Sequence, residues 1–165
     1  FIFSKSLEAL IAKMRQAGVH IEREGSGIRV AAKPPFTPVD VSTAPHPGFP
    51  TDMQAQYMVL NCIASGKSVI QERIFENRFL HVQELSRLGA VIELRGNSTA
   101  VVTGVNKLTA AQVMATDLRA SSSLVIAALM AQGKTVIDRI YHIDRGYEAI
   151  EHKIRALGGF IERAS

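Results

Sequence analysis

The chain contains an internal repeat, and this repeat constrains its fold more than any other feature. Residues 51–78 and 116–145 each open with Thr-Asp, continue through an apolar run and end on an arginine. Within them, residues 66–78 and 133–145 align without a gap at a constant offset of 67 residues. A recurring unit of this size is a supersecondary structure, so it is identified before single elements are interpreted.

A third feature follows the same period. Amphipathic stretches end at Gly18, Gly89 and Gly158, and β-prone residues follow each of these glycines. We therefore interpret the chain as one domain built from a tandem array of α/β units of about 70 residues. The units span approximately residues 1–31, 51–104 and 116–165, and the first is truncated at its start.

Composition indicates an ordered globular protein, because 47% of the residues are hydrophobic and 21% are charged. No apolar run of about 18 residues and no signal peptide is present, so we expect a soluble protein without a membrane partner. Cys62 is the only cysteine and cannot form an internal disulfide, which agrees with a cytoplasmic location. The chain starts at Phe1, within residues that read as a strand, and we expect a piece of a longer protein.

The charge of the chain permits an anionic partner without indicating nucleic acid. The formal net charge is +4 and the 19 basic residues are dispersed. The three tyrosines do not alternate with basic residues, as the stacking platforms of a nucleic-acid surface would. We expect no nucleic-acid partner, whereas phosphorylated small molecules remain open.

Three surface helices with one buried stripe are predicted from apolar residues at helical spacing. These residues are Leu7, Leu10, Ile11, Met14 and Ala17, then Val82, Leu85 and Leu88, then Tyr147, Ile150, Ile154 and Leu157. Residues 53–64 and 121–131 form two further helices that are apolar on nearly every side, so we expect sheets to enclose them. Strands are predicted at 20–22, 28–31, 68–71, 91–94, 100–103, 135–137 and 160–162.

All six prolines lie in residues 33–50, which precede the first full repeat. This density excludes a regular helix and favours extended backbone, so the connection should be stiff. A plain linker is one interpretation. We favour a segment that helps to hold a site, because it leads directly to the helix start at Thr51.

Asp52 and Asp117 stand at equivalent helix starts, where an aspartate commonly caps free backbone N–H groups. Duplication copies caps as readily as sites, so capping remains open for both residues. Arg119 is unusual, because an arginine in the first turn meets the positive end of the helix dipole unless an anion lies nearby. Together with Arg145, it would bind a phosphate or carboxylate. The alternative is that Arg119 pairs with Asp117 or another surface acid.

Other reactive residue types indicate no further site. Cys62 lies within an apolar helix without a neighbouring base, which predicts a buried, inert thiol. The histidines, His20, His46, His81, His142 and His152, lack metal-ligand spacing, and we predict no metal site. The sequence also contains no glycine-rich phosphate loop.

Four ordered motifs carry a resemblance to a known family. They are APHPGFPTDMQAQ, IFENRF, ATDLRASSSLVIAAL and RIYHIDRGYE. The chain resembles, over essentially its whole length, the C-terminal region of the bacterial UDP-N-acetylglucosamine 1-carboxyvinyltransferases, a branch of the enolpyruvyl transferase family. The resemblance implies an α/β fold of the α+β type, in which repeated βαβαββ units pack their sheets around enclosed helices as an inside-out barrel.

The resemblance also implies an activity. Members of this branch transfer the enolpyruvyl group of phosphoenolpyruvate to the 3-hydroxyl of UDP-N-acetylglucosamine. This is the first committed step of peptidoglycan synthesis, on which cell wall, cell shape and cell division depend. The implied partners are these two substrates and the missing N-terminal portion of the same enzyme, and no cofactor is implied. The cysteine that protonates the methylene carbon belongs to that portion, so we expect the isolated chain to be inactive.

The resemblance assigns roles to the aspartates and arginines of the repeat. Asp52 matches the carboxylate that contacts the sugar hydroxyl and accepts its proton. Asp117 matches a residue near the reacting centre. Arg119 and Arg145 match arginines that bind the charged groups of phosphoenolpyruvate, a role suited to the planar guanidinium group.

Two further positions match residues of the nucleotide-sugar site. Ile74 occupies the position whose backbone binds the UDP-sugar, and Phe75 lies beside it near the nucleotide. The strings PTDMQAQ, DLRAS and YHIDRGYE favour this branch over the related 3-phosphoshikimate 1-carboxyvinyltransferases. A non-catalytic nucleic-acid-binding module is the remaining alternative, and it would need the clustered basic face that the sequence lacks.

Overall fold

A computed structural model describes residues 7–164, and the strand expected around Phe1 lies outside the described residues. In chain order the elements are α2 (Glu8–Gln16), β1 (His20–Glu24), β2 (Gly27–Ala31), β3 (Val41–Ser42), the 3₁₀ helix η1 (Thr51–Met53), α3 (Gln54–Cys62), β4 (Lys67–Gln71), α4 (His81–Arg87), β5 (Val91–Arg95), β6 (Thr99–Thr103), β7 (Gln112–Met114), α5 (Leu118–Met130), β8 (Val136–Asp138), α6 (Tyr141–Asp144) and α7 (Ile150–Ala156).

The elements from β3 to β6 follow the βαβαββ order that the resemblance implies. Their four-stranded sheet has the order β3-β4-β6-β5, with β3 parallel to β4 and the other neighbours antiparallel. Val41 pairs with Ile70, and Ile70 pairs with Ala100. All three side chains are buried in the main core. The alternation of buried and exposed residues along β4 therefore turns one face of the sheet toward the helices.

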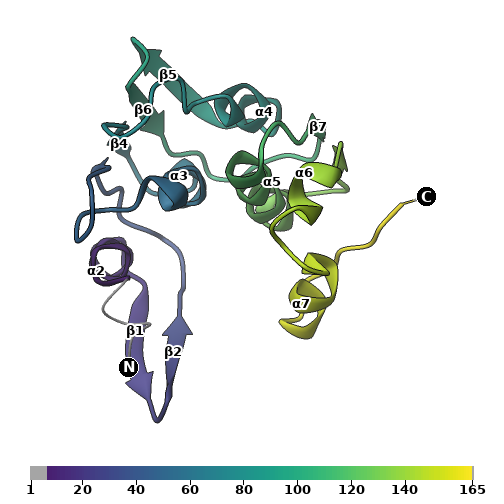
Figure 1. Cartoon of the computed structure of the whole chain (residues 1–165), viewed down its shortest axis with the longest axis horizontal. Helices are drawn as coiled ribbons and strands as arrows, with labels where there is room; N and C mark the ends of the chain where they lie inside the picture. Colours follow the sequence, from purple (N-terminus) through teal and green to yellow (C-terminus); the bar gives the residue numbers. More distant parts are fainter. Residues whose placement is uncertain (1–6, 165) are drawn as a thin grey trace.

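Helices α3 and α5 lie side by side in the middle of the molecule (Figure 1). Met58 of α3 and Leu124 of α5 are completely buried, and Gln56 Nε2 donates a hydrogen bond to Ser122 Oγ at 2.7 Å. Most of α3 is buried, so the prediction that this helix is enclosed is confirmed. The core between the two repeats is thus built from the helices that lack charged residues within their apolar runs.

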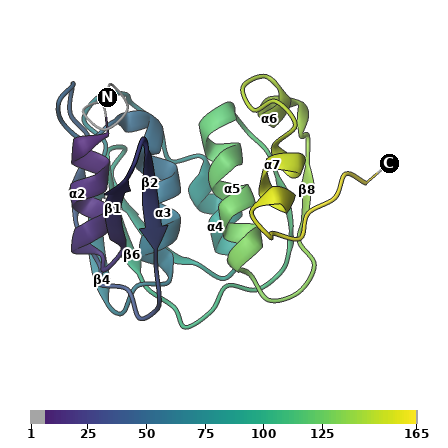
Figure 2. The ribbon, with the colours of Figure 1, turned by 90° about the horizontal axis from the view of Figure 1, so that it is seen from below.

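The first two predicted surface helices are confirmed as α2 and α4. Each is followed by a glycine in the left-handed region, as is α7, at φ values of 95°, 86° and 88° for Gly18, Gly89 and Gly158. Helix α2 and the hairpin β1–β2 form one end of the molecule, beside α3 (Figure 2). Tyr57 links α3 to this end by donating a hydrogen bond to the carbonyl of Lys13 at 2.7 Å.

The third unit differs from the prediction at its C-terminal end and on the exposed face of α5. Residues 160–162 form no strand, because no neighbouring strand within the described residues supplies hydrogen-bonding partners. Leu157 and Phe160 are 88% and 91% exposed, so the predicted buried stripe of α7 is wrong at its end. The full enclosure predicted for 121–131 is also wrong, since the small sheet β7–β8 leaves Ile126 and Leu129 exposed.

The proline-rich segment is hydrogen-bonded to two core elements, α3 and β4. Asn61 of α3 exchanges hydrogen bonds with the backbone of Val39, at 3.2 and 3.0 Å. Asp40 Oδ1 accepts a hydrogen bond of 2.7 Å from the backbone N–H of Val69 in β4. The short strand β3 follows, an element that the prolines hid from sequence reasoning. These contacts anchor the segment that leads to Thr51.

Candidate active site

The predicted residues Asp52 and Arg119 meet where the two full repeats join. Asp52 lies in η1, immediately before α3, and Arg119 lies in the first turn of α5. Because α3 and α5 pack side by side, their N-terminal ends bring the two side chains together. Arg119 Nε contacts Asp52 Oδ1, and Arg119 Nη2 donates a hydrogen bond of 3.2 Å to Asp52 Oδ2. The ion pair is therefore bidentate, the geometry that an arginine offers to any carboxylate.

A second arginine reaches the same carboxylate. Arg78 Nη1 lies 3.1 Å from Asp52 Oδ1 and also donates a hydrogen bond of 3.0 Å to Thr51 Oγ1. Burial raises the pKa of the Asp52 carboxyl, but the hydrogen bonds and charges of Arg119 and Arg78 outweigh burial and lower the pKa below its ordinary value. The side chain of Asp52 is 55% exposed, so an incoming ligand has access to it.

The two equivalent aspartates have different structural roles. Asp117 is the N-cap of α5, and its Oδ1 accepts hydrogen bonds of 2.9 Å from the backbone N–H groups of Arg119 and Ala120. Asp52 makes no such cap, because η1 intervenes and Met53 occupies the N-cap position of α3. The capping interpretation thus holds for Asp117, whereas for Asp52 it is wrong.

The interpretation of Arg119 as a partner of a surface acid is confirmed, and that acid is Asp52. The carboxylate of Asp52 supplies the negative charge that a cationic side chain near the N-terminus of α5 needs. The hydrogen bond to Asp52 raises the pKa of the Arg119 guanidinium. Two nitrogens of the Arg119 side chain are consequently held against the Asp52 carboxylate.

Arg145 lies at the end of α6 and is exposed. Gly146, which follows it, packs so closely on Leu118 that a side chain at this glycine would overlap the leucine. The loop after α6 therefore reaches the beginning of α5. Within residues 7–164 the side chain of Arg145 makes no hydrogen bond or ion pair, and the structure does not join it to the Asp52–Arg119 pair.

Ile74 and Phe75 follow β4 in a tight loop. Their backbone N–H groups both donate to Glu72 Oε1, at 2.9 and 3.2 Å. The ring of Phe75 is exposed, and the guanidinium carbon of Arg78 lies 4.4 Å from its centroid. Arg78 thus links the loop predicted to bind the nucleotide sugar to the predicted base Asp52.

Sequence reasoning missed the parts played by Glu72 and Arg78. The position of Arg78 carried a signal, since it ends the first repeat where Arg145 ends the second. Glu72 carried none, because a glutamate directly after a strand is usually exposed to solvent. Its burial depends on Thr43 and Thr51, which lie far from it in the sequence.

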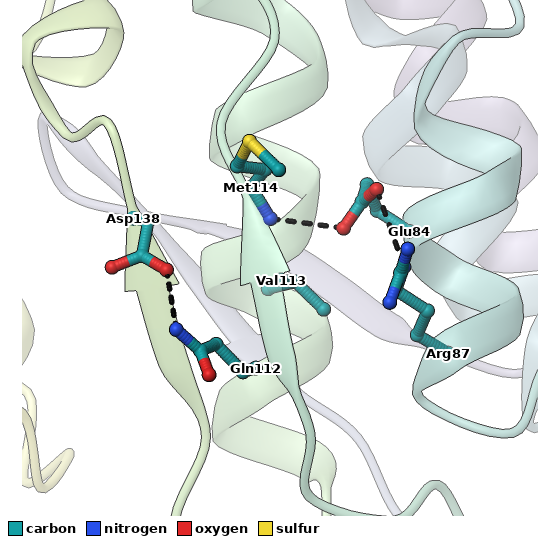
Figure 3. A pocket seen from close by; sticks show the side chains of 6 residues that line it. All are labelled: Glu84, Arg87, Gln112, Val113, Met114 and Asp138. Carbon is teal, nitrogen blue, oxygen red and sulfur yellow. Dashed lines mark hydrogen bonds and ion pairs between the residues drawn. The ribbon is translucent and has the colours of Figure 1, made fainter.

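A small pocket lies elsewhere and shares no lining residue with the predicted site. It is a cavity of about 170 Å³ between α4 and the sheet β7–β8 (Figure 3), lined by Glu84, Arg87, Gln112, Val113, Met114 and Asp138. Glu84 Oε2 accepts a hydrogen bond of 2.9 Å from the Met114 N–H, and Gln112 Nε2 donates one of 2.8 Å to Asp138 Oδ2. The polar side chains of this pocket thus pair with one another or with the backbone, and none of them belongs to the charged cluster at Asp52.

Residues 7–164 contain neither a cluster of metal-ligating side chains nor a membrane-spanning helix. No three side chains of the His, Cys, Asp or Glu types lie together as they would around a metal ion. No described helix has both the length and the apolar character required to cross a membrane.

Comparison with known proteins establishes the family. A family model described as EPSP synthase (3-phosphoshikimate 1-carboxyvinyltransferase) matches residues 2–154. The chain belongs to the EPSP synthase family. The match includes every predicted site residue, from Asp52 to Arg145.

Curated relatives of this EPSP synthase family chain carry a more specific name. Proteins called UDP-N-acetylglucosamine 1-carboxyvinyltransferase from Desulfatibacillum aliphaticivorans and Novosphingobium aromaticivorans are 62% and 59% identical to it, over 157 and 159 residues. The alignments cover 95% and 96% of the chain but only 38% and 37% of the relatives. The resemblance predicted from the four motifs is confirmed, and the chain spans less than two-fifths of these relatives.

Solved structures support the same fold. The enolpyruvyl transferase NikO from Streptomyces tendae superposes with a TM-score of 0.86 at 27% identity, over 96% of this chain and 36% of that chain. An EPSP synthase from Acinetobacter baumannii gives a TM-score of 0.70 at 17% identity, over 96% and 37% of the two chains. The predicted enolpyruvyl transferase-like α/β fold of this EPSP synthase family chain is confirmed.

Proposed function

We propose that this chain forms one wall of the active site of an enzyme that transfers enolpyruvyl from phosphoenolpyruvate to the 3-hydroxyl of UDP-N-acetylglucosamine. The observation that carries the proposal is the exposed carboxylate of Asp52, held between Arg119 and Arg78 where two repeats join. Relatives up to 62% identical that bear this enzyme's name support the choice of substrates. The reaction would be the first committed step of peptidoglycan synthesis, carried out in the cytoplasm.

In this proposal Asp52 accepts the proton of the sugar 3-hydroxyl. The hydroxyl oxygen forms a bond to C2 of phosphoenolpyruvate, and the bond from C2 to the phosphate oxygen breaks. Inorganic phosphate leaves, and the enolpyruvyl group remains on the sugar as an ether. The cysteine expected in the remainder of the enzyme protonates the methylene carbon while the new ether bond forms at C2. As phosphate leaves, the resulting methyl group gives up a proton and the enol double bond is restored. This chain therefore supplies the base of the first step and not its acid.

The two arginines of the second repeat would bind the anionic substrate. Arg119 already binds one carboxylate in a bidentate manner, and Arg145 is exposed at the end of α6. When phosphoenolpyruvate binds Arg119, the carboxylate of Asp52 loses part of its contact with this positive charge. The pKa of Asp52 then rises, which makes it a better proton acceptor at the moment when both substrates are bound. Asp117 would hold the N-terminus of α5, and with it Arg119, near the reacting centre.

The loop of Ile74 and Phe75 would contact the nucleotide sugar. Phe75 exposes an aromatic ring beside Arg78 of the same loop, and Arg78 in turn donates a hydrogen bond to Asp52. The remainder of the enzyme would close the site from the other side. The isolated chain should therefore bind substrates weakly and catalyse nothing.

Phosphate release by the full-length enzyme tests the proposal. We expect phosphate release from phosphoenolpyruvate with UDP-N-acetylglucosamine as acceptor and none with shikimate 3-phosphate. The isolated 165-residue chain should release no phosphate above a buffer blank with either acceptor. Turnover with shikimate 3-phosphate alone would instead support the 3-phosphoshikimate branch. A full-length enzyme that is inactive with both acceptors would refute the proposal.

A further inference from the structure

Glu72 is a buried carboxylate without a role in the reaction described above. It follows β4 directly, and only 2% of its surface is exposed. Within residues 7–164 the four hydrogen-bond partners of its carboxylate are all donors. Oε1 accepts from Thr43 Oγ1 at 2.8 Å and from the N–H groups of Ile74 and Phe75, and Oε2 accepts from Thr51 Oγ1 at 2.9 Å.

These bonds join three separate segments at one side chain. Thr51 directly precedes Asp52, and its hydroxyl also accepts the hydrogen bond from Arg78. Thr43 belongs to the proline-rich segment, and its Oγ1 accepts a hydrogen bond of 2.8 Å from the N–H of Arg73. Glu72 therefore holds Thr51, the residue before Asp52, through Oε2. It holds the 73–75 loop through Oε1.

The second repeat lacks this arrangement. At the constant offset of the repeat, Arg139 occupies the position of Glu72. Thr116 corresponds to Thr51, because each precedes the aspartate of its repeat, yet within residues 7–164 Thr116 Oγ1 has no hydrogen-bond partner. The Glu72 cluster is thus a feature of the repeat that carries Asp52, and a copied fold element would appear in both.

We propose that Glu72 is a positioning residue that fixes the position of Asp52 relative to the 73–75 loop. The proposal rests on the proposed function and deepens it, since it couples the base to the nucleotide-sugar loop. An ionised acceptor binds its donors more strongly and at shorter distance than a neutral one. A displacement of about 1 Å at a reacting group can cost a factor of about 10² in rate, so the position of Asp52 relative to the loop matters for turnover.

The two oxygens of Glu72 can be tested separately in the full-length enzyme. In Glu72→Gln the amide oxygen keeps the three donors of Oε1, whereas the amide nitrogen cannot accept from Thr51. Thr51→Val removes the same hydrogen bond from the other side. Both variants should lower kcat about tenfold and leave the KM for UDP-N-acetylglucosamine within about twofold.

The hydrogen bonds made by Oε1 of Glu72 are tested by Thr43→Val. This change removes one donor from Glu72 and the acceptor of the Arg73 N–H. It should raise the KM for UDP-N-acetylglucosamine about tenfold with a smaller effect on kcat. Hydrogen exchange of the 73–75 amides should become about tenfold faster in Thr43→Val and stay unchanged in Thr51→Val.

A double-mutant cycle distinguishes positioning from general destabilisation. If Thr51 acts through Glu72, the double variant Thr51→Val/Glu72→Gln should be no slower than either single variant. Thr116→Val is the matched control, because the equivalent threonine has no such bond, and it should leave kcat and KM unchanged. Additive losses in the cycle, or equal losses in Thr116→Val, would overturn the proposal.

The exchange measurement needs no turnover, so it separates this proposal from the proposed function. Unchanged exchange at 73–75 in Thr43→Val overturns the role of Glu72 even if the wild-type enzyme is active. Faster exchange there in an enzyme that does not release phosphate refutes the transferase function and leaves the structural coupling standing. If Glu72→Gln does not fold, the two threonine variants still decide the outcome.

Discussion

Arg119 of the second repeat and Asp52 of the first form a bidentate ion pair across the junction of α3 and α5. Each residue lies at the start of the most apolar helix of its own repeat, so packing of the two helices brings the charges together. Arg78 adds a second positive charge from within the first repeat. The predicted base is therefore assembled only when both repeats are in place.

The ion pair predicts a defined change in pH dependence. Asp52 must be ionised to accept a proton, and Arg119 helps to lower its pKa. Arg119→Gln should raise this pKa, so the acid limb of the kcat/KM profile should move to higher pH, and the KM for phosphoenolpyruvate should rise about tenfold or more. The measurement is a pH profile of the full-length enzyme.

Arg145→Gln is the matched control for this profile. Arg145 has no ion pair with Asp52, so its loss should raise the KM for phosphoenolpyruvate without moving the acid limb. An acid limb that stays in place in Arg119→Gln, or that moves equally in both variants, would count against the ion pair as the cause.

His81 predicts a loss of stability in mild acid. The residue is 2% exposed at the start of α4, and burial lowers its pKa to about 4, against a smaller opposing effect of Asp117. Between pH 6.5 and 4 the unfolded chain binds a proton that the folded chain excludes, so stability present above pH 6.5 is lost as the pH falls. The loss attributable to His81 should reach on the order of 3 kcal/mol near pH 4.

Thermal unfolding of the full-length protein at pH 7 and pH 5 checks this effect. Glutamine does not titrate, so the melting temperature of His81→Gln should fall less between pH 7 and pH 5 than that of the wild type. His152→Gln, a change at an exposed residue of α7, should follow the wild type. If His81→Gln and the wild type lose the same melting temperature, the buried histidine is not responsible.

Cys62 should not react in the native protein. It is fully buried on α3, as predicted, and burial raises the pKa of its thiol to about 12, so almost no thiolate exists at neutral pH. A thiol reagent followed by peptide mapping should modify Cys62 only after denaturation. Rapid modification of the peptide containing Cys62 under native conditions would contradict both its burial and its structural role.

Much of the fold was predictable because its signals are local. Helical spacing marked α2 and α4, and the apolar runs marked α3 and α5. The failures lie where an element depends on a partner distant in sequence. Residues 160–162 have β-prone side chains, but a strand needs a neighbour to pair with. Leu157 is exposed for a related reason, since helical spacing marks an apolar stripe without specifying what covers it.

The site was predictable in its residues and not in its contacts. The repeat and the resemblance pointed to Asp52 and Arg119, but capping and ion pairing use the same residue types at the same helix starts. Only the packing of α3 against α5 distinguishes the two roles. Glu72 was missed because its donors come from Thr43 and Thr51, which lie 29 and 21 residues earlier in the chain.

The most direct test of the central claim is the kcat of Asp52→Asn in the full-length enzyme. Asparagine fits the site but cannot act as a carboxylate base, so kcat should fall by about 10² to 10⁴. The melting temperature should change little, because Asp52 caps no helix and its ion pairs are exposed to solvent. A near-normal kcat in Asp52→Asn would contradict the assignment of Asp52 as the base.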